Sequence, residues 1–482
     1  MKRILIFAVV LSLLVPAVAF AATEFSLGGY IKLDAYWDST NNGKNINGTP
    51  ARNNDAVLFA GTVIPGNAHH GNLRFTAQGS RFNFTIKGPE VLGAKLTGFI
   101  EMDFDSCTNT AGTSSQAYVP RLRHAMFRLN WPGETELLFG QYWSMFCDWF
   151  PEVAEDGPFQ VTGIPTFRLA QIRFTQGFAC DWKVAALIGQ AQNDVGLFSG
   201  SPYDTTGSVN NGGAAETPQI EGQIKYAHDW WGKAAFYGNP IPLTASVTAG
   251  WQRNVATPEA NAVVGVDSGF TGGVANKNFW TVYNPHTYVS SWMVQGSLFI
   301  PVIPTHTNDL TNTMHLLVQP YIGRGLGNFG MGGDATNVFK FNSNFWPGHL
   351  RADLELLDRY GLMAEAQYYF TNQWFVNAAY AITAAMNFNE SKLNVPGLGS
   401  VPQYLYNGVN QVRSMQQLDA TLWYQPIKAL KFGLQYSYVH CEYLLDAYPQ
   451  GGIPTWGNTG SLGKLANLSD EHRVEFVGFF FF

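Results

Sequence analysis

Acidic and basic side chains that could select charged solutes are concentrated in a few segments of the sequence. Four carboxylates fall within nine residues that hold no basic residue: Asp148, Glu152, Glu155 and Asp156. Five arginines lie in segments before and after them: Arg74, Arg81, Arg121, Arg123 and Arg173. Arginine keeps its charge and pairs well with carboxylates, so the two sets facing each other across water would create an electric field. Such a field selects solutes by charge and dipole, as charged rings do in channels.

Other chemistry finds little support in the sequence. The four cysteines and ten histidines form no CxxC or HExxH pattern, and the histidine spacing does not suggest a metal site. The GxGxxG match over residues 325–330 follows a predicted strand and enters a long loop, without a helix to hold a pyrophosphate. No Ser-His-Asp or paired-carboxylate arrangement stands out. We therefore expect no enzymatic activity, no cofactor and no metal, while a disulfide among Cys107, Cys147, Cys180 and Cys441 remains open.

The composition is unusual for a water-soluble chain of 482 residues. Charged residues make up 13% where about 25% is ordinary, and aromatic residues reach 15%, with 50 glycines. After the first segment, no stretch reaches the roughly 18 apolar residues that a membrane helix needs. An aromatic-rich, charge-poor chain without a spanning helix indicates a transmembrane β-barrel. The net charge of −6 argues against general nucleic-acid binding.

The first 21 residues have the pattern of a secretory signal peptide. Lys2 and Arg3 precede a mostly apolar run over residues 4–18, and Ala19-Phe20-Ala21 supplies a small-x-small cleavage site. A membrane-anchor helix is the alternative, but the run is short and ends in a cleavage motif. We predict cleavage after Ala21 and a single barrel domain over residues 22–482.

Strict alternation of apolar and polar residues recurs along the remaining chain. In residues 81–87, Phe82, Phe84 and Ile86 alternate with polar residues, as expected for a strand with one apolar and one polar face. Similar segments predict sixteen strands, give or take one, an even number typical of bacterial barrels. These strands are near 25–38, 72–87, 94–104, 119–130, 134–141, 167–177, 181–190, 217–227, 242–253, 286–300, 313–323, 360–370, 374–386, 412–425, 430–441 and 470–482. The polar faces of the early strands also carry Lys32, Asp34, Glu101 and Asp103, which we add to the candidate pore-lining residues.

The connections between these strands alternate in length. Short ones, near 88–92, 131–133, 178–180, Asp229, 371–373 and 426–429, alternate with long ones such as 39–71, 142–166 and 254–285. Short periplasmic turns and long extracellular loops produce this alternation in an outer-membrane barrel. Residues 351–358, inside one long loop, carry charges compatible with a short helix.

Aromatic residues support the same topology. Six tryptophans lie at or beside short connections, where an aromatic belt at the periplasmic membrane surface would place them: Trp131, Trp182, Trp230, Trp231, Trp374 and Trp423. The chain ends in an apolar segment that fits a closing strand, with Val474, Phe476, Phe480 and Phe482 facing lipid.

The sequence resembles general porins of Gram-negative outer membranes, and more specifically DcaP-like trimeric porins and the abundant porins of metal-respiring bacteria. The resemblance lies in Gly29-Tyr-Ile-Lys-Leu-Asp34, Ser80-Arg-Phe82, residues 98–104, Pro151-Glu152, Gly157-Pro158 and residues 171–175, and most specifically in Phe139-Gly-Gln-Tyr-Trp-Ser-Met-Phe146. It covers the first 180 residues well and the remainder mainly by architecture. Cysteines at 107 and 147 and the long loops after Trp251 depart from the pattern.

The resemblance implies a homotrimer in which the third extracellular loop, residues 142–166, folds inward and constricts the pore. We therefore expect a water-filled outer-membrane channel for small hydrophilic solutes and ions. The predicted wall arginines, which resist neutralisation, suggest a pore that tolerates or favours small organic anions despite the negative net charge. Expected partners are outer-membrane lipid and lipopolysaccharide, and the barrel-assembly machinery through Phe482. The alternative is a barrel that serves mainly as a scaffold or adhesin for surface or electron-transfer partners.

Overall fold

The computed structural model describes most of the chain after the predicted signal peptide. The described residues are 23–39, 71–104, 120–154, 163–165, 167–191, 216–255, 262–265, 279–283, 288–329, 337–346, 349–386, 392–395, 399–402, 404–406, 412–443 and 468–482. The predicted signal peptide lies outside them, as do Glu155, Asp156 and Cys107. Within these residues there is no helix with the length and apolar character needed to cross a membrane.

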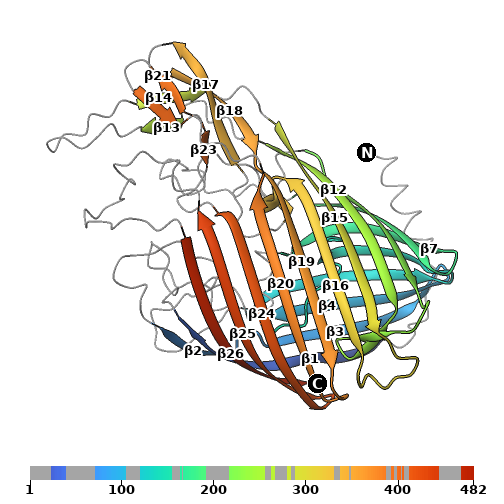
Figure 1. Cartoon of the computed structure of the whole chain (residues 1–482). Helices are drawn as coiled ribbons and strands as arrows, with labels where there is room; N and C mark the ends of the chain where they lie inside the picture. The colour runs from blue at the N-terminus through green and yellow to red at the C-terminus, as the bar shows by residue number, and fades with distance from the viewer. Residues whose placement is uncertain are drawn as a thin grey trace, which may run out of the picture.

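The described strands form a closed antiparallel barrel of sixteen strands, as the alternation predicted (Figure 1). Closure is made by β1 and β26, which pair over nine residues, from Tyr30 opposite Phe481 to Asp38 opposite Arg473. The barrel strands are β1 (Glu24–Asp38), β2 and β3 (Asn72–Thr76, Arg81–Val91), β4 (Ala94–Asp103), β5 (Arg121–Trp131), β6 (Thr135–Trp143), β7 (Arg168–Phe178), β8 (Trp182–Gly189), β9 (Gln219–His228), β12 (Leu243–Val255), β15 (Tyr288–Ile303), β16 (Met314–Arg324), β19 (Asp358–Tyr369), β20 (Trp374–Ala385), β24 (Val412–Ile427), β25 (Leu430–Tyr443) and β26 (Leu468–Phe481).

The second barrel strand is interrupted, which is why it carries two labels. Both β2 and β3 pair with β1, and residues 77–80 between them leave the ladder. The hydroxyl of Ser80 accepts a 3.0 Å hydrogen bond from the Lys32 backbone N–H and so replaces the missing ladder partner. Gly79 leaves room for the Lys32 side chain, because a Cβ there would lie 2.8 Å from Lys32 Cδ.

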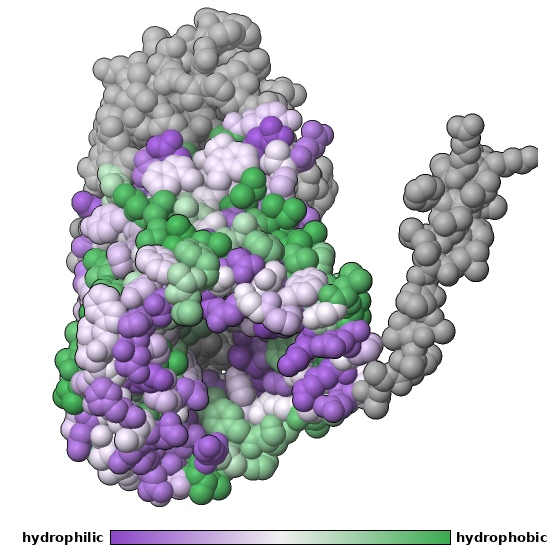
Figure 2. All heavy atoms as spheres, turned by 90° about the vertical axis from the view of Figure 1, so that its right-hand side faces the viewer, coloured by the Kyte–Doolittle hydropathy of each residue, from purple (hydrophilic) through white to green (hydrophobic). Residues whose placement is uncertain are grey.

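Side chains alternate between the two faces of the wall. On β1, Ile31 and Leu33 are exposed on the outside, whereas Lys32 and Asp34 are buried inside. Figure 2 shows hydrophobic side chains gathered in patches on the outer face of the molecule, next to hydrophilic ones. Because lipid solvates apolar groups and the lumen holds polar ones, this is the pattern of a membrane barrel with a hydrophilic interior. The outward positions predicted for Val474, Phe476, Phe480 and Phe482 are confirmed by their exposure.

The tryptophan belt is partly as predicted. Trp182, Trp230, Trp231 and Trp374 are exposed at the end of the barrel with short connections. Trp423 is not part of the belt, since it is fully buried inside the barrel and its indole N–H donates to the Glu152 carbonyl at 2.8 Å. The prediction for Trp423 used only its position beside a short turn. Alternation along β24 puts its side chain on the inner face, where it cannot contact lipid.

Most connections at this end are tight. Leu92 and Gly93 join β3 to β4, and both have positive φ, as a two-residue type I′ turn requires. The connection near Asp229, predicted as a short turn, is an exception. It runs from the end of β9 at His228 to the start of β12 at Leu243 and contains a hairpin, β10 (Ala234–Phe236) and β11 (Asn239–Ile241).

At the opposite end, three long loops contribute to a second sheet, which lies beyond the ends of the barrel strands (Figure 1). It consists of β13 (Ala262–Gly265), β14 (Phe279–Tyr283), β17 (Asn337–Trp346), β18 (His349–Leu356) and β23 (Tyr404–Tyr406). Residues 351–358, whose charges are compatible with a short helix, form no helix: residues 351–356 belong to β18, and Asp358 begins β19. A two-stranded sheet, β21 (Lys392–Val395) with β22 (Gly399–Pro402), and the 3₁₀ turn η2 (Leu326–Phe329) complete this end.

Candidate functional site

The first part of the loop that follows β6 lies inside the barrel, whereas residues 155–162 and 166 of the predicted constriction loop 142–166 lie outside the described residues. Residues 144–154 cross the interior and contact inward-facing side chains on strands from β9 to β25. The two limbs of the loop touch each other, since the Cys147 thiol donates to the Pro165 carbonyl at 3.0 Å. We call residues 144–154 the pore loop.

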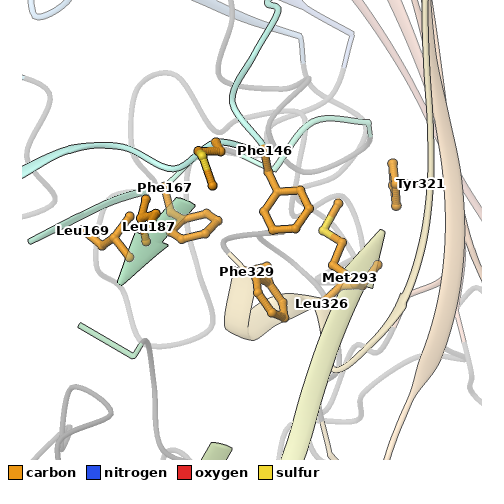
Figure 3. Close-up of a cluster of buried hydrophobic side chains, with 9 residues drawn as sticks. Phe146, Phe167, Leu169, Leu187, Met293, Tyr321, Leu326 and Phe329 are labelled. Atoms are coloured by element: carbon orange, nitrogen blue, oxygen red, sulfur yellow. The ribbon is translucent and has the colours of Figure 1, made fainter. Parts of the chain in front are cut away.

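An apolar cluster holds the start of the pore loop. Figure 3 shows Phe146 pointing toward Phe329 of η2, and their ring centroids are 5.6 Å apart. Gly250 on β12 makes room for Phe146, because a Cβ there would lie 2.6 Å from the ring. The backbone N–H of Met145 donates to Glu221 at 2.7 Å, and the Ser144 hydroxyl donates to the same carboxylate. Leu326 and Phe329 belong to the GxGxxG segment, residues 325–330, so this segment packs against the pore loop.

Asp148, the first acid of the pore loop, pairs with a lysine on the wall. Its carboxylate accepts from Lys225 Nζ at 2.8 Å and from the Ser246 hydroxyl at 2.8 Å. The Asp148 side chain retains 14% exposure. This acid therefore attaches the loop to β9 and β12 and still contacts the lumen.

Glu152, the second acid, is almost completely buried. Its carboxylate accepts from Lys431 Nζ, from Gln367 Nε2 at 2.8 Å and from the backbone N–H of Tyr237 at 3.2 Å. Its own backbone N–H donates to Glu365 at 2.8 Å. A carboxylate this enclosed is stable only when charge and hydrogen bonds compensate it, so Glu152 is an anchor of the pore loop.

The wall formed by β4 and β5 carries a network of ion pairs. Arg121 makes two hydrogen bonds to the Asp103 carboxylate, at 2.9 and 2.7 Å. Arg123 bridges the two acids, at 2.8 Å from Glu101 and 2.6 Å from Asp103. Arg81 Nε lies 3.8 Å from Glu101. The Asp103 carboxylate accepts from two planar guanidinium groups, and these hydrogen bonds fix the orientation of the Arg121 and Arg123 side chains.

A β-bulge in β5 explains how Arg123 reaches this network. The register against β4 shifts between Glu101 and Met102, so one extra residue of β5 is accommodated. As a result both Arg123 and His124 are buried, while Leu122 remains exposed outside. Bulges re-aim side chains in this way.

Arg168, at the start of β7, adds a further positive charge that the sequence analysis did not select. Its guanidinium carbon lies 4.5 Å from the centroid of the Trp143 ring, and that of Arg123 lies 5.7 Å from the same ring. Its Nη1 is buried without a hydrogen-bond partner among the described residues. Strict alternation would put Arg168 on the outer face with Ile172 and Phe174, which are exposed outside. Its guanidinium group instead lies beside the ring that Arg123 also approaches, so alternation could not predict its position.

The structure places the predicted pore-lining residues of the barrel wall at several different positions. Arg81, Arg121, Arg123, Glu101 and Asp103 form the wall network. Lys32 and Asp34 pair at 2.8 Å on the neighbouring strand β1, where Lys32 Nζ also donates to the Ala154 carbonyl at 3.0 Å. Arg173 lies farther along β7, where it donates to Gln171 and to the Trp143 carbonyl. Arg74 pairs with Tyr36 through the backbone, and its side chain lies outside the description.

The acids were expected to face the wall arginines, yet the contacts above join Asp148 and Glu152 to lysines. Lys225 and Lys431 were missed, although both lie on inward faces of predicted strands and the alternation alone could have found them. No group of three or more His, Cys, Asp or Glu side chains in the described part of the chain is arranged to hold a metal ion.

Comparisons with known proteins agree with this geometry. A model of the Gram-negative porin family matches residues 8–298, more than half of the chain. The structure is similar to the outer-membrane channel DcaP of Acinetobacter baumannii, with 14% identity, a TM-score of 0.59, and coverage of 96% of this chain and 98% of that one. OprB of Pseudomonas putida is 10% identical over 95% of this chain and 94% of its own, with a TM-score of 0.47. No curated protein matches the sequence. The chain belongs to the Gram-negative porin family and lies in the outer membrane.

Proposed function

We propose that this porin is a passive diffusion channel for small hydrophilic solutes and ions, and that it favours small organic anions. The observation that supports this preference is the excess of arginine on one wall. Four guanidinium groups, from Arg81, Arg121, Arg123 and Arg168, accompany the two carboxylates of Glu101 and Asp103. Arg81 and Arg121 keep 22% and 28% exposure, so they remain accessible from the lumen.

Planar-bilayer recordings in unequal salt concentrations test the proposal. Replacing Arg81, Arg121 and Arg168 by Gln leaves Arg123 to compensate the two acids, and the anion-to-cation permeability ratio should fall. We expect a fall of about threefold or more, because charges in a confined pore are less screened than on an open surface. The change should shrink near about 1 M salt, where the Debye length is roughly 3 Å.

A charge removed elsewhere provides the control. Lys183 pairs with Glu134 at 3.2 Å in an exposed position, so Lys183→Gln should leave the ratio unchanged. A triple variant with an unaltered ratio would show that the wall network is not the selective part. A wild-type protein that forms no channels would refute the diffusion function itself.

We propose that the acids of the predicted constriction act in the opposite direction. Asp148 keeps some exposure, so its removal should raise the anion preference more directly than removal of the enclosed Glu152. Glu155 and Asp156 are included in this proposal because of their negative charge alone. Removing them should also raise the anion-to-cation permeability ratio.

We further propose that the chain has no catalytic role, binds no nucleic acid, and is secreted with cleavage after Ala21. It would assemble as a homotrimer in contact with lipid and lipopolysaccharide, and Phe482 would engage the assembly machinery. The short connections would face the periplasm and the long loops the cell exterior.

A surface-binding role is the second candidate, because the long loops build the five-stranded sheet of β13, β14, β18, β17 and β23. If that role dominates, deleting β13 and β14 should abolish attachment of cells to their partner while single-channel conductance persists.

A further inference from the structure

We propose that the hairpin β10–β11 is a positioning element that enters the lumen from the short-connection end, holds the pore loop from below and confines solutes to the half of the barrel lined by β3–β7. Tyr237, at its tip, is the positioning residue. This inference rests on the proposed diffusion function and adds a second element to the constriction.

The base of the hairpin is fixed to the neighbouring connection. Lys233 and Thr305 exchange two backbone hydrogen bonds, at 2.9 and 2.7 Å, as in a short antiparallel bridge. The indole N–H of Trp231 donates to the Pro301 carbonyl at 2.8 Å. These hydrogen bonds fix the base of the hairpin to the connection between β15 and β16.

The body of the hairpin packs inside the barrel. Ala234 and Ala235 are buried, and Phe236 lies 4.9 Å from Trp149 of the pore loop and 5.8 Å from Phe299 of β15, measured between ring centroids. His315, buried on β16, contacts the Ala235 carbonyl through Nδ1 at 2.6 Å, so that nitrogen carries the proton. Apolar packing and a buried hydrogen bond thus hold the hairpin against the wall.

The tip of the hairpin contacts the pore loop. Tyr237 and Gly238 both have positive φ, 47° and 71°, which closes a type I′ turn between the two strands. A tyrosine is uncommon in this conformation. Its backbone N–H donates to Glu152 at 3.2 Å, and its hydroxyl donates to the Pro151 carbonyl at 3.0 Å. The tip thus meets the loop at the carboxylate that also anchors it to the wall.

Together the hairpin and the pore loop fill one side of the barrel. The inward side chains of β15, β16, β19 and β20 that surround them have no exposure: Phe299, Leu317, Met363 and Ala379. On the opposite side, Arg81 and Arg121 keep their exposure. Water and solutes are therefore excluded from the side formed by β15, β16, β19 and β20. They cross the barrel along the side that carries Arg81 and Arg121.

A clean deletion of the hairpin tests the inference. Ala234 pairs with Ile241 across the hairpin, so their backbones are close, and two glycines can replace residues 234–241. We expect the single-channel conductance to rise about twofold, because the sealed side becomes available to water in a barrel of unchanged strand number. The contribution of the arginines to ion selectivity should decrease at the same time.

Cys147 provides a second readout that does not depend on conduction. It is buried in the pore loop, so a small methanethiosulfonate reagent should not label it in the wild type. In the deletion variant the pore loop is released, and Cys147 should become labelled. Both proteins carry serine in place of the other three cysteines, so that only Cys147 can react.

Two further variants complete the design. Phe236→Asp places a charge in the apolar packing and should reproduce both effects if the deletion fails to assemble. Asn308→Asp adds the same charge at an exposed position on the neighbouring connection and should reproduce neither. Wild-type conductance and an unlabelled Cys147 in correctly folded hairpin variants would overturn the inference, whereas a wild type without channels would overturn the proposed function instead.

Discussion

The ammonium group of Lys431 contacts the carboxylate of Glu152 and lies 3.8 Å from the centroid of the Trp423 ring. The three side chains come from β25, the pore loop and β24, so this buried ion pair joins the loop to the wall of the barrel at a second place besides Asp148 and Lys225. Both charged groups are under 10% exposed, and neither can turn to water without moving the loop.

Removing one partner of this pair should destabilise the protein more than removing both. Lys431→Met leaves the Glu152 charge buried without its cation, and we expect a loss of roughly 3–5 kcal/mol in the free energy of unfolding. The double variant Lys431→Met/Glu152→Gln should recover part of that loss, because no uncompensated charge remains. Urea unfolding in detergent, followed by tryptophan fluorescence, measures both. Equal stabilities of the single variant and the wild type would contradict the role of the pair.

The thiol of Cys147 should be unreactive in the folded porin at pH 8. Burial raises its pKa to about 12, from an ordinary value of 9.0, because the thiolate would lose its hydration. About one thiol in ten thousand is then ionised at pH 8, and only the thiolate reacts. Labelling by iodoacetamide should increase about tenfold per pH unit between 8 and 11, as long as the barrel stays folded.

Cys180 serves as the comparison within the same protein. It is exposed in the tight connection between β7 and β8, so it should label readily under the same conditions. Mass spectrometry of the two tryptic peptides distinguishes them. Labelling of both cysteines at similar rates would show that the pore loop is open to solvent.

The outward register of β3 predicts opposite effects at two adjacent positions. Phe84 is exposed on the outer face, so Phe84→Arg should cost about 2–4 kcal/mol near the middle of the membrane. Thr85 lies on the inner face, where arginine is solvated by the lumen, and Thr85→Arg should be tolerated. Unfolding of each variant in lipid vesicles provides the measurement. Equal losses would place the wrong face toward lipid.

The orientation of the barrel predicts which connections an impermeant reagent reaches. A membrane-impermeant maleimide applied to intact cells should miss Cys180 and a cysteine introduced at Asn372, since both lie at the short-connection end. Cysteines introduced into residues 39–71 or 254–285 should be labelled. Labelling at Asn372 from outside would reverse the orientation.

The sequence by itself determined the barrel and its strands. Each of the sixteen predicted segments overlaps a barrel strand, because a wall between lipid and water imposes a period of two on every strand. The same period predicted the inward positions of Lys32, Asp34, Glu101 and Asp103. Resemblance, not periodicity, predicted that the loop after β6 would fold inward.

The tertiary structure alone decided which charged groups meet and where the lumen is closed. Lys431 and Glu152 are 279 residues apart, and no local pattern couples them. Trp423 and Arg168 have surroundings that their positions in the sequence do not indicate, because the pore loop reaches one and Trp143 packs on the other. The hairpin β10–β11 likewise looks like a short connection until its partners are known. Its apolar residues are buried by Trp149 and Phe299, which only the closed barrel brings to it.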